Sequence, residues 1–159
     1  MKKILTGLVM GFVLFAVVAK LAAPGMMLKE RTSPLSYDET IAKIESAVTN
    51  GGWEISRKMD MHKSLAQRGK TVPRVTLLKI CEPNHAARIL NDDKAMYVSL
   101  MMPCTISIYE KSNGKVYVAT MNAGIMGGIF GGTVAKVMAG SVAPETAQFT
   151  AFLDVKIED

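Results

Sequence analysis

Residues 75–90 constrain the fold of this chain most, because they join a strand pattern directly to a helix pattern. The strand pattern ends at Cys81. Pro83 follows at a position typical of a first helical turn, where the amide that proline lacks would have no partner. Backbone amides point outward at such a junction, so a thiol there can have unusual chemistry. We therefore take Cys81 as the centre of a candidate site.

The patterns on either side of this junction indicate an α+β domain with a small, mainly antiparallel sheet and packed helices. A capping-box sequence at Ser36–Glu39 predicts a helix start, and Asn113–Gly114 predicts a hairpin with a two-residue turn of positive φ angles. We assign residues 32–122 to this domain, and residues 123–159 complete or extend it. The expected strands are 53–57, 72–80, 95–102, 104–110 and 115–121, and the expected helices are 36–50, 59–69, 84–91 and one beginning at Glu145.

The N-terminal segment is the most apolar part of the chain. Residues 4–19 contain no charged side chain, Lys20 interrupts, and residues 21–28 are again uncharged. Residues 4–28 are long enough to span a bilayer if Lys20 extends toward the headgroups. A cleaved signal peptide is the alternative. We expect residues 1–31 to form a single-pass anchor in the inner or cytoplasmic membrane, followed by a short link. Membrane lipid is then the partner of residues 4–28, and the domain lies on the extracytoplasmic side.

The net charge of +5 does not indicate nucleic-acid binding. Residues 1–31 contribute five basic side chains and one acidic side chain, so the rest of the chain is nearly neutral. That part has no basic run, and its few aromatic residues do not alternate with cations. We therefore expect no nucleic-acid partner.

Residues 122–140 are unusually rich in glycine and methionine. If they form one helix, Gly124, Gly128 and Gly132 lie in a row that lets another backbone approach closely. Each glycine costs a helix about 1 kcal/mol relative to alanine, so we predict that this row is a contact surface, within the monomer or between two copies. Phosphate binding is disfavoured because Thr133 stands where a P-loop needs lysine. Residues 116–135 carry no charge, so a second membrane span is a further alternative. The predicted hairpin disfavours it, because it makes the first third of this stretch a strand.

Four side chains are candidates for a ligand or redox site: His62, Cys81, His85 and Cys104. One interpretation is that each cysteine is a small buried apolar side chain, and another is that the two form an extracytoplasmic disulfide. Cys81 and His85 are four residues apart and also suit ligation of copper or haem iron. A further alternative is a nucleophilic Cys81 paired with His62 or His85. The sequence has no CxxC or CxxCH motif, so the usual thioredoxin and c-type haem motifs are absent. Further soft donors are the thioethers of Met101, Met102, Met121 and Met126.

The motifs at His62, Cys81–Ala86 and Met102–Cys104, in this order ahead of a hairpin, resemble those of the family catalogued as domain of unknown function 302. The resemblance covers roughly residues 33–121. It implies a small α+β domain that is commonly a homodimer, and it implies no agreed activity and no catalytic residue. Some relatives also resemble this chain in an N-terminal membrane helix and in a Met-Asn-x-Gly segment like that of Met121–Gly124.

We therefore expect a membrane-anchored extracytoplasmic binding or assembly module of unknown ligand, forming a homodimer. The alternatives are a thiol-based redox or hydrolytic enzyme that uses Cys81, or a metal- or haem-binding protein. Thiol reactivity separates them, because a Cys81 with a low pKa would be alkylated quickly at neutral pH. We also predict that His62, Cys81 and Cys104 lie near one another.

Overall fold

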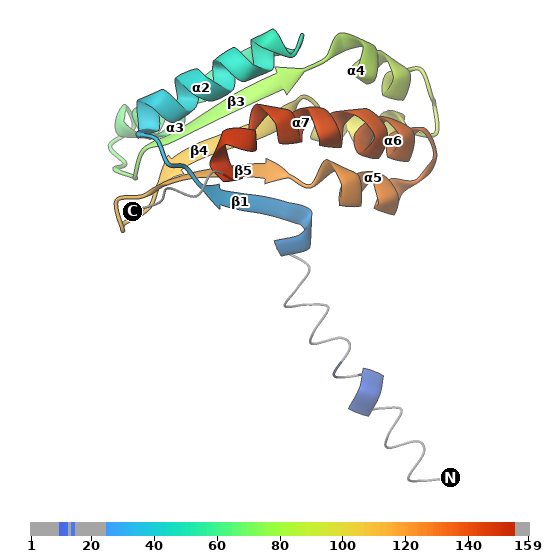
Figure 1. Cartoon of the computed structure of the whole chain (residues 1–159), viewed down its shortest axis with the longest axis horizontal. Helices are drawn as coiled ribbons and strands as arrows, with labels where there is room; N and C mark the ends of the chain where they lie inside the picture. Colours follow the sequence, from blue (N-terminus) through green and yellow to red (C-terminus); the bar gives the residue numbers. More distant parts are fainter. Residues whose placement is uncertain (1–9, 13, 15–24, 155–159) are drawn as a thin grey trace.

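The computed structural model describes residues 10–12, 14 and 25–154 (Figure 1). It shows an α+β domain with one antiparallel sheet in the order β1-β5-β4-β3-β2, which confirms the predicted fold class. The strands are β1 (Leu28–Thr32), β2 (Glu54–Asp60), β3 (Val75–Cys81), β4 (Cys104–Glu110) and β5 (Val116–Met121). The helical elements are α2 (Tyr37–Asn50), α3 (Met61–Ala66), α4 (Pro83–Leu90), η1 (Met96–Met101), α5 (Ala123–Phe130), α6 (Gly132–Val137), η2 (Met138–Val142), α7 (Ala143–Phe149) and η3 (Ala151–Asp154).

The core lies between the sheet and the helices α2 and α7, which lie side by side over one of its faces (Figure 1). Side chains alternate across a strand, so every second residue of β3 and β4 points into this core. Leu78, Ile80, Ile106 and Ile108 are accordingly buried. The apolar face of α2 meets them with Tyr37, Ile41, Ile44 and Val48.

The predicted helix start at Ser36 is confirmed, and the predicted hairpin is present with a longer loop. The Ser36 side chain accepts a hydrogen bond from the Glu39 amide, and the Glu39 carboxylate accepts one from the Ser36 amide, so a capping box begins α2. The β4–β5 hairpin is also present, but its loop has three residues, 112–114, between the bonded residues Lys111 and Lys115. Only Gly114 in this loop has a positive φ, of 75°, so the predicted two-residue turn is wrong. Pro83 is the first residue of α4, directly after β3 and the N-cap Glu82.

The strand predicted over residues 95–102 is wrong, because Met96–Met101 forms the 3-10 helix η1. Within η1 only Val98 is buried. A short apolar run has no period that separates a strand from a helical turn, and this ambiguity misled the prediction. The Met102–Pro103 peptide bond is cis, and β4 begins at the next residue, Cys104.

The N-terminal boundary of the sheet also differs from the prediction. Residues 28–31, which we assigned to the anchor and its link, pair with residues 118–121 of β5 as part of β1. Most of residues 4–24 lies outside the described residues, so the anchor stays a prediction. Among residues 10–12, 14 and 25–154, no helix has the length and apolar character needed to cross a membrane.

Residues 122–140 do not form one straight helix. α5 ends at Phe130, and the next two residues, Gly131 and Gly132, have φ values of 69° and 54°. Glycine adopts positive φ without steric cost, so this pair turns the chain from α5 into α6. The last predicted helix is α7, which begins two residues before Glu145 and ends at the buried Phe149.

This turn interrupts the predicted glycine row. A Cβ atom added at Gly128 or Gly132 would have no neighbouring atom within 4 Å, whereas one at Gly124 would make ordinary contacts. Among the glycines of residues 122–140, the closest packing is at Gly127, where a Cβ would lie 3.0 Å from Cβ of Met138. Within the monomer the tight contact is therefore one position away from the predicted row, and a contact between two copies stays a prediction.

Candidate functional site

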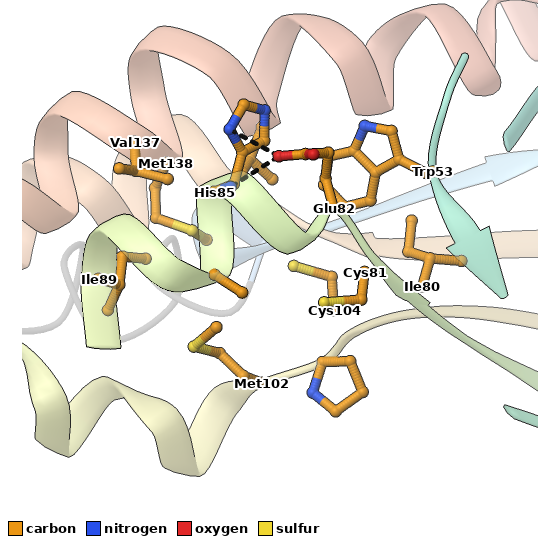
Figure 2. Close-up of a pocket in the computed structure, with 13 residues that line it drawn as sticks. Trp53, Ile80, Cys81, Glu82, His85, Ile89, Met102, Cys104, Val137 and Met138 are labelled. Atoms are coloured by element: carbon orange, nitrogen blue, oxygen red, sulfur yellow. Dashed lines mark hydrogen bonds and ion pairs between the residues drawn. The ribbon is translucent and has the colours of Figure 1, made fainter. Parts of the chain in front are cut away.

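A small cavity of about 30 Å³ lies where β3 ends and α4 begins. Figure 2 shows β-strand residues on one side of it and α4, α6 and η2 on the other. A space of this size holds one ion or a few small atoms and is far smaller than a typical small-molecule site. Its lining residues are Trp53, Ile80, Cys81, Glu82, His85, Ala86, Ile89, Met102, Pro103, Cys104, Val137, Met138 and Val142.

Two candidate cysteines reach this cavity from neighbouring strands. Ile80 of β3 pairs directly with Cys104 of β4, so Cys81 lies one residue out of register with Cys104. Both cysteines are free thiols of intermediate exposure, and Figure 2 shows their sulfur atoms close together beside the cavity. The structure thus brings Cys81 and Cys104 together, although 22 residues lie between them in the sequence.

Neither thiol has the environment of an activated nucleophile. Burial raises the pKa of Cys81, and the carboxylates of Glu54 and Glu82 raise it further. Burial, followed by the neighbouring Cys81, raises the pKa of Cys104. The first amides of α4 do not compensate, because both oxygens of Glu82 accept hydrogen bonds from them. The helix start therefore does not activate Cys81, and both thiols stay protonated at neutral pH.

His85 is held by a carboxylate at each ring nitrogen. Its Nδ1 lies 3.2 Å from Glu82 Oε2, and its Nε2 lies 3.0 Å from Glu145 Oε1. The indole N–H of Trp53 donates to the other oxygen of Glu145 at 2.6 Å. A metal ligand needs a ring nitrogen with an available lone pair, and both nitrogens of His85 face carboxylate acceptors. His85 therefore connects α4 to α7 at the rim of the cavity.

His62 does not belong to this site. It lies on α3, and its Nδ1 is 3.0 Å from the carbonyl oxygen of Val75, the first residue of β3. Val75 and Cys81 are at opposite ends of β3, about 20 Å apart along the strand. The prediction that His62 clusters with the two cysteines is wrong, because α3 packs against the beginning of β3 and the cysteines lie at its end.

His62 instead lines a polar cavity of about 230 Å³ beside α2, α3 and β3, which sequence analysis did not predict. The hydroxyl groups of Tyr37 and Thr76 are 2.7 Å apart, and Thr76 donates to Asp60 at 2.7 Å. The guanidinium of Arg74 lies 4.0 Å from the centre of the Tyr37 ring. The ion pairs of this cavity are Arg74–Asp38, Lys63–Asp60 and Lys58–Glu45.

The size and lining of the cavity beside the cysteines bear on the two predicted cofactors, haem and copper. Haem does not fit a space of about 30 Å³. The described part of the chain contains no group of three or more His, Cys, Asp or Glu side chains arranged to hold a metal ion. The potential donors at the cavity are instead four sulfur atoms, from Cys81, Cys104, Met102 and Met138 (Figure 2). Of the four methionines predicted as soft donors, only Met102 lines this cavity.

Residues 29–151 match the family described as "Domain of unknown function DUF302". The chain belongs to the DUF302 family. A DUF302 protein from Bacillus stearothermophilus, described as an uncharacterized conserved protein, has a similar crystal structure, with a TM-score of 0.67 and 22% sequence identity over 81% of this chain and 97% of that chain. This likeness shows a common fold. No curated protein matches the sequence.

The DUF302 match is longer than the resemblance over residues 33–121, because it includes most of β1 and continues through α7. Three residues from this wider domain belong to the site and escaped sequence analysis: Trp53, Met138 and Glu145. Trp53 had a usable signal, since it is the only tryptophan and follows a helix-ending glycine pair. Glu145 had none, because 60 residues separate it from His85.

Proposed function

We propose that this DUF302 protein is a membrane-anchored, extracytoplasmic binding module whose cavity binds a single soft metal ion, Cu(I). The main support is the lining of the cavity, where the thiols of Cys81 and Cys104 and the thioethers of Met102 and Met138 border one small apolar space. Thiolate and thioether ligands select Cu(I) over hard cations. The cavity volume of about 30 Å³ suits one ion and excludes a large cofactor.

The raised thiol pKa values give the proposal a definite pH dependence. Cysteine ligates a metal as the thiolate, so each thiol that binds the ion releases one proton. Burial raises the pKa of both Cys81 and Cys104, so protons compete with the metal at neutral pH. The apparent affinity for Cu(I) should therefore increase as the pH rises from 6 to 8.

Metal titration of the full-length chain in detergent tests the cavity directly. The reduced protein is titrated with Cu(I) under anaerobic conditions against a chromophoric copper chelator, and bound copper is read from the thiolate-to-copper absorption. We expect one ion per chain in the wild type. Cys81→Ser and Cys104→Ser should each abolish this binding, and Met138→Leu should weaken it severalfold.

Met96→Leu is the matched control, because Met96 is 49% exposed and does not line the cavity. This variant should bind Cu(I) like the wild type. Wild-type affinity in both cysteine variants would overturn the proposed site, since no cavity thiol would then be needed for binding.

The membrane anchor is the second part of the proposal. Residues 4–19 and 21–28 are uncharged, and Lys2 and Lys3 precede them, which favours an N-terminus that stays in the cytoplasm. β1 begins at the end of this segment, so the domain would follow the anchor directly on the extracytoplasmic side. Carbonate washing of membranes should leave the protein in the pellet, whereas a soluble form that begins near Lys20 would show cleavage instead.

The module is further proposed to be a homodimer. The support is the resemblance to a family that is commonly dimeric, together with the open surface at Gly128 and Gly132. Light scattering of the detergent-solubilised chain tests this proposal. Gly128→Leu should shift the dimer to monomer without lowering the melting temperature, because beyond the adjacent backbone of α5 no atom of the same chain lies within 4 Å of the added Cβ. A wild-type dimer that the substitution leaves intact would place the interface elsewhere.

A dithiol redox function is the second candidate, and the shared cavity of the two cysteines favours it. Cys81 and Cys104 both line this small space, and Cys81 is near enough to raise the pKa of Cys104. In such a reaction the pair would lose two protons and two electrons to a disulfide of a partner protein, which would become two thiols. Mass spectrometry after equilibration with oxidised glutathione distinguishes the candidates, because a redox pair forms a reversible Cys81–Cys104 disulfide and a metal site remains reduced.

A further inference from the structure

Four exposed apolar side chains lie together at one end of the domain. Leu100 is 92% exposed, Ile129 63%, Tyr97 60% and Met96 49%. Three of them come from η1 and Ile129 comes from α5. The ring of Tyr97 packs edge to face against Phe130, with ring centres 5.9 Å apart, so η1 and the end of α5 are in contact. We call Met96, Tyr97, Leu100 and Ile129 the apolar end.

The segments that build the apolar end contain no charged residue. Residues 95–109 and residues 116–135 both lack Asp, Glu, Lys and Arg. In contrast, the exposed positions of α2 include Asp38, Glu39 and Lys43. Soluble domains rarely expose a contiguous apolar patch unless it meets a partner or a membrane.

The chain enters the domain beside α5, the helix that carries Ile129. The amide of Asn122 donates to the carbonyl oxygen of Met27 at 2.8 Å, and the side chain of Asn122 donates to that of Met26 at 2.9 Å. Asn122 is the N-cap of α5, and Ile129 lies about 10 Å further along this helix. Figure 1 shows the start of β1 next to α5, so residues 25–28 lie on this side of the domain.

Residues 26–28, where the chain enters the domain, are also apolar and exposed. Met26 is 52% exposed, Met27 40% and Leu28 59%. They follow directly on the uncharged sequence of residues 4–19 and 21–24. A bilayer spanned by that sequence would therefore lie next to the apolar end, at a high effective concentration. A free partner protein would have no such link to this position.

From this geometry we propose that the apolar end docks on the surface of the bilayer, with Leu100, Tyr97 and Ile129 in the boundary between headgroups and acyl chains. Aliphatic side chains and a tyrosine are the residues that this boundary accepts. The inference rests on the proposed anchor and adds a fixed orientation of the domain to it. η1 ends one residue before Met102, so docking would hold the sulfur-lined cavity close to the membrane.

Tryptophan quenching in vesicles tests the orientation. The full-length chain is reconstituted into vesicles of phosphatidylcholine and phosphatidylglycerol, with and without brominated acyl chains. The variants are Leu100→Trp, Ile129→Trp and the control Val72→Trp. Val72 is 37% exposed and precedes β3 at the end opposite Cys81. The native Trp53 is 4% exposed and gives the same background in every variant.

We expect brominated lipid to quench the added fluorescence of Leu100→Trp and Ile129→Trp, and to leave that of Val72→Trp unchanged. Unquenched emission at positions 100 and 129 in protein that sediments with the vesicles would overturn docking and leave the anchor intact. Protein that fails to sediment with the vesicles would overturn the anchor and docking together. Emission at position 100 that depends on protein density and not on bromination would show that a second copy covers the apolar end.

Discussion

The two cavities at the ends of β3 differ in what their polar groups do. At its amino end, Tyr37, Thr76 and Asp60 form a chain of hydrogen bonds, and the ionised side chains around them are paired. At its carboxyl end, the polar groups of His85 and Glu145 bind each other at the rim, and sulfur and carbon atoms line the interior. One strand thus separates a closed polar network from an apolar space lined by soft donors.

This difference separates a feature that folding explains from one that it does not. Every buried side-chain nitrogen and oxygen in the described part of the chain has a hydrogen-bond partner, as stable packing requires. The network around Thr76 meets that requirement and needs no ligand. Folding imposes no comparable reason to gather Cys81, Cys104, Met102 and Met138 at one cavity, because apolar side chains would pack there equally well.

The largest predicted effect comes from filling the tight contact behind the sulfur-lined cavity. Gly127→Ala would place a Cβ 3.0 Å from Cβ of Met138 and 3.1 Å from the backbone nitrogen of Ala139. We expect the free energy of unfolding to fall by about 3 kcal/mol, because backbone atoms cannot move aside cheaply. Chemical denaturation of the full chain measures it, and copper binding should weaken as Met138 shifts.

Gly128→Ala is the matched control, on the same helix and with the same added atom. Because it meets open space, it should leave stability unchanged or raise it by about 1 kcal/mol. Equal stabilities of the two variants would contradict the close packing of α5 against η2.

The second largest effect is predicted for a substitution that breaks the polar network at the amino end of β3. Thr76 is fully buried, accepts from Tyr37 and donates to Asp60. Thr76→Val keeps the shape but leaves the Tyr37 hydroxyl without its acceptor, so we expect a loss of about 2 kcal/mol in unfolding free energy. The double variant Tyr37→Phe/Thr76→Val should recover part of that loss. Copper affinity should remain that of the wild type, and a large change in it would couple the two cavities.

Local signals predicted the parts of the fold that depend on neighbouring residues. The Ser36 capping box and the junction at Cys81 each act within a few residues, and both formed as expected. Asn113–Gly114 correctly predicted the hairpin but not its three-residue loop. The first error was η1, where a short apolar run has the composition of a strand and no decisive period. The second was β1, because the apolar sequence before it suggested that the anchor and its link reach residue 31.

The part of the candidate site that could be predicted from the sequence is the part that lies on adjacent strands. Cys81 and Cys104 reach one cavity because β3 and β4 are paired neighbours, so the end of β3 lies beside the start of β4. The contact of Glu145 with His85 depends on how α7 packs after the Gly131–Gly132 turn, and no local pattern encodes that path. His62 failed as a site residue for a related reason, since its motif is close to that of Cys81 in sequence but lies at the far end of β3.

A pH effect sharpens the contrast at the polar end. Hydrogen bonds from Lys63 and then Thr76 hold the pKa of Asp60 below its ordinary value of 3.8. A lowered pKa in the folded state stabilises the protein above about pH 4, and this contribution disappears as the pH falls through the folded-state pKa. Asp60→Asn should therefore cost about 1 kcal/mol or less at pH 6, since Asp60 is partly exposed, and less still at pH 3. A stability difference between wild type and variant that does not change with pH would assign the role of Asp60 to shape alone.

The smallest effect concerns the charge beside the sulfur-lined cavity. After burial, Glu54 and then Glu82 raise the pKa of Cys81, so less thiolate is present at neutral pH. Glu54→Gln and Glu82→Gln each remove one negative charge that raises the pKa of Cys81, so each should speed alkylation of Cys81 by iodoacetamide at pH 7. Asp38→Asn, at the polar end, should leave the rate unchanged. Peptide mass spectrometry measures the rates at Cys81 and Cys104 separately. Wild-type rates in both glutamine variants would show that burial alone keeps Cys81 protonated, and the two ends of β3 would then differ in packing and not in charge.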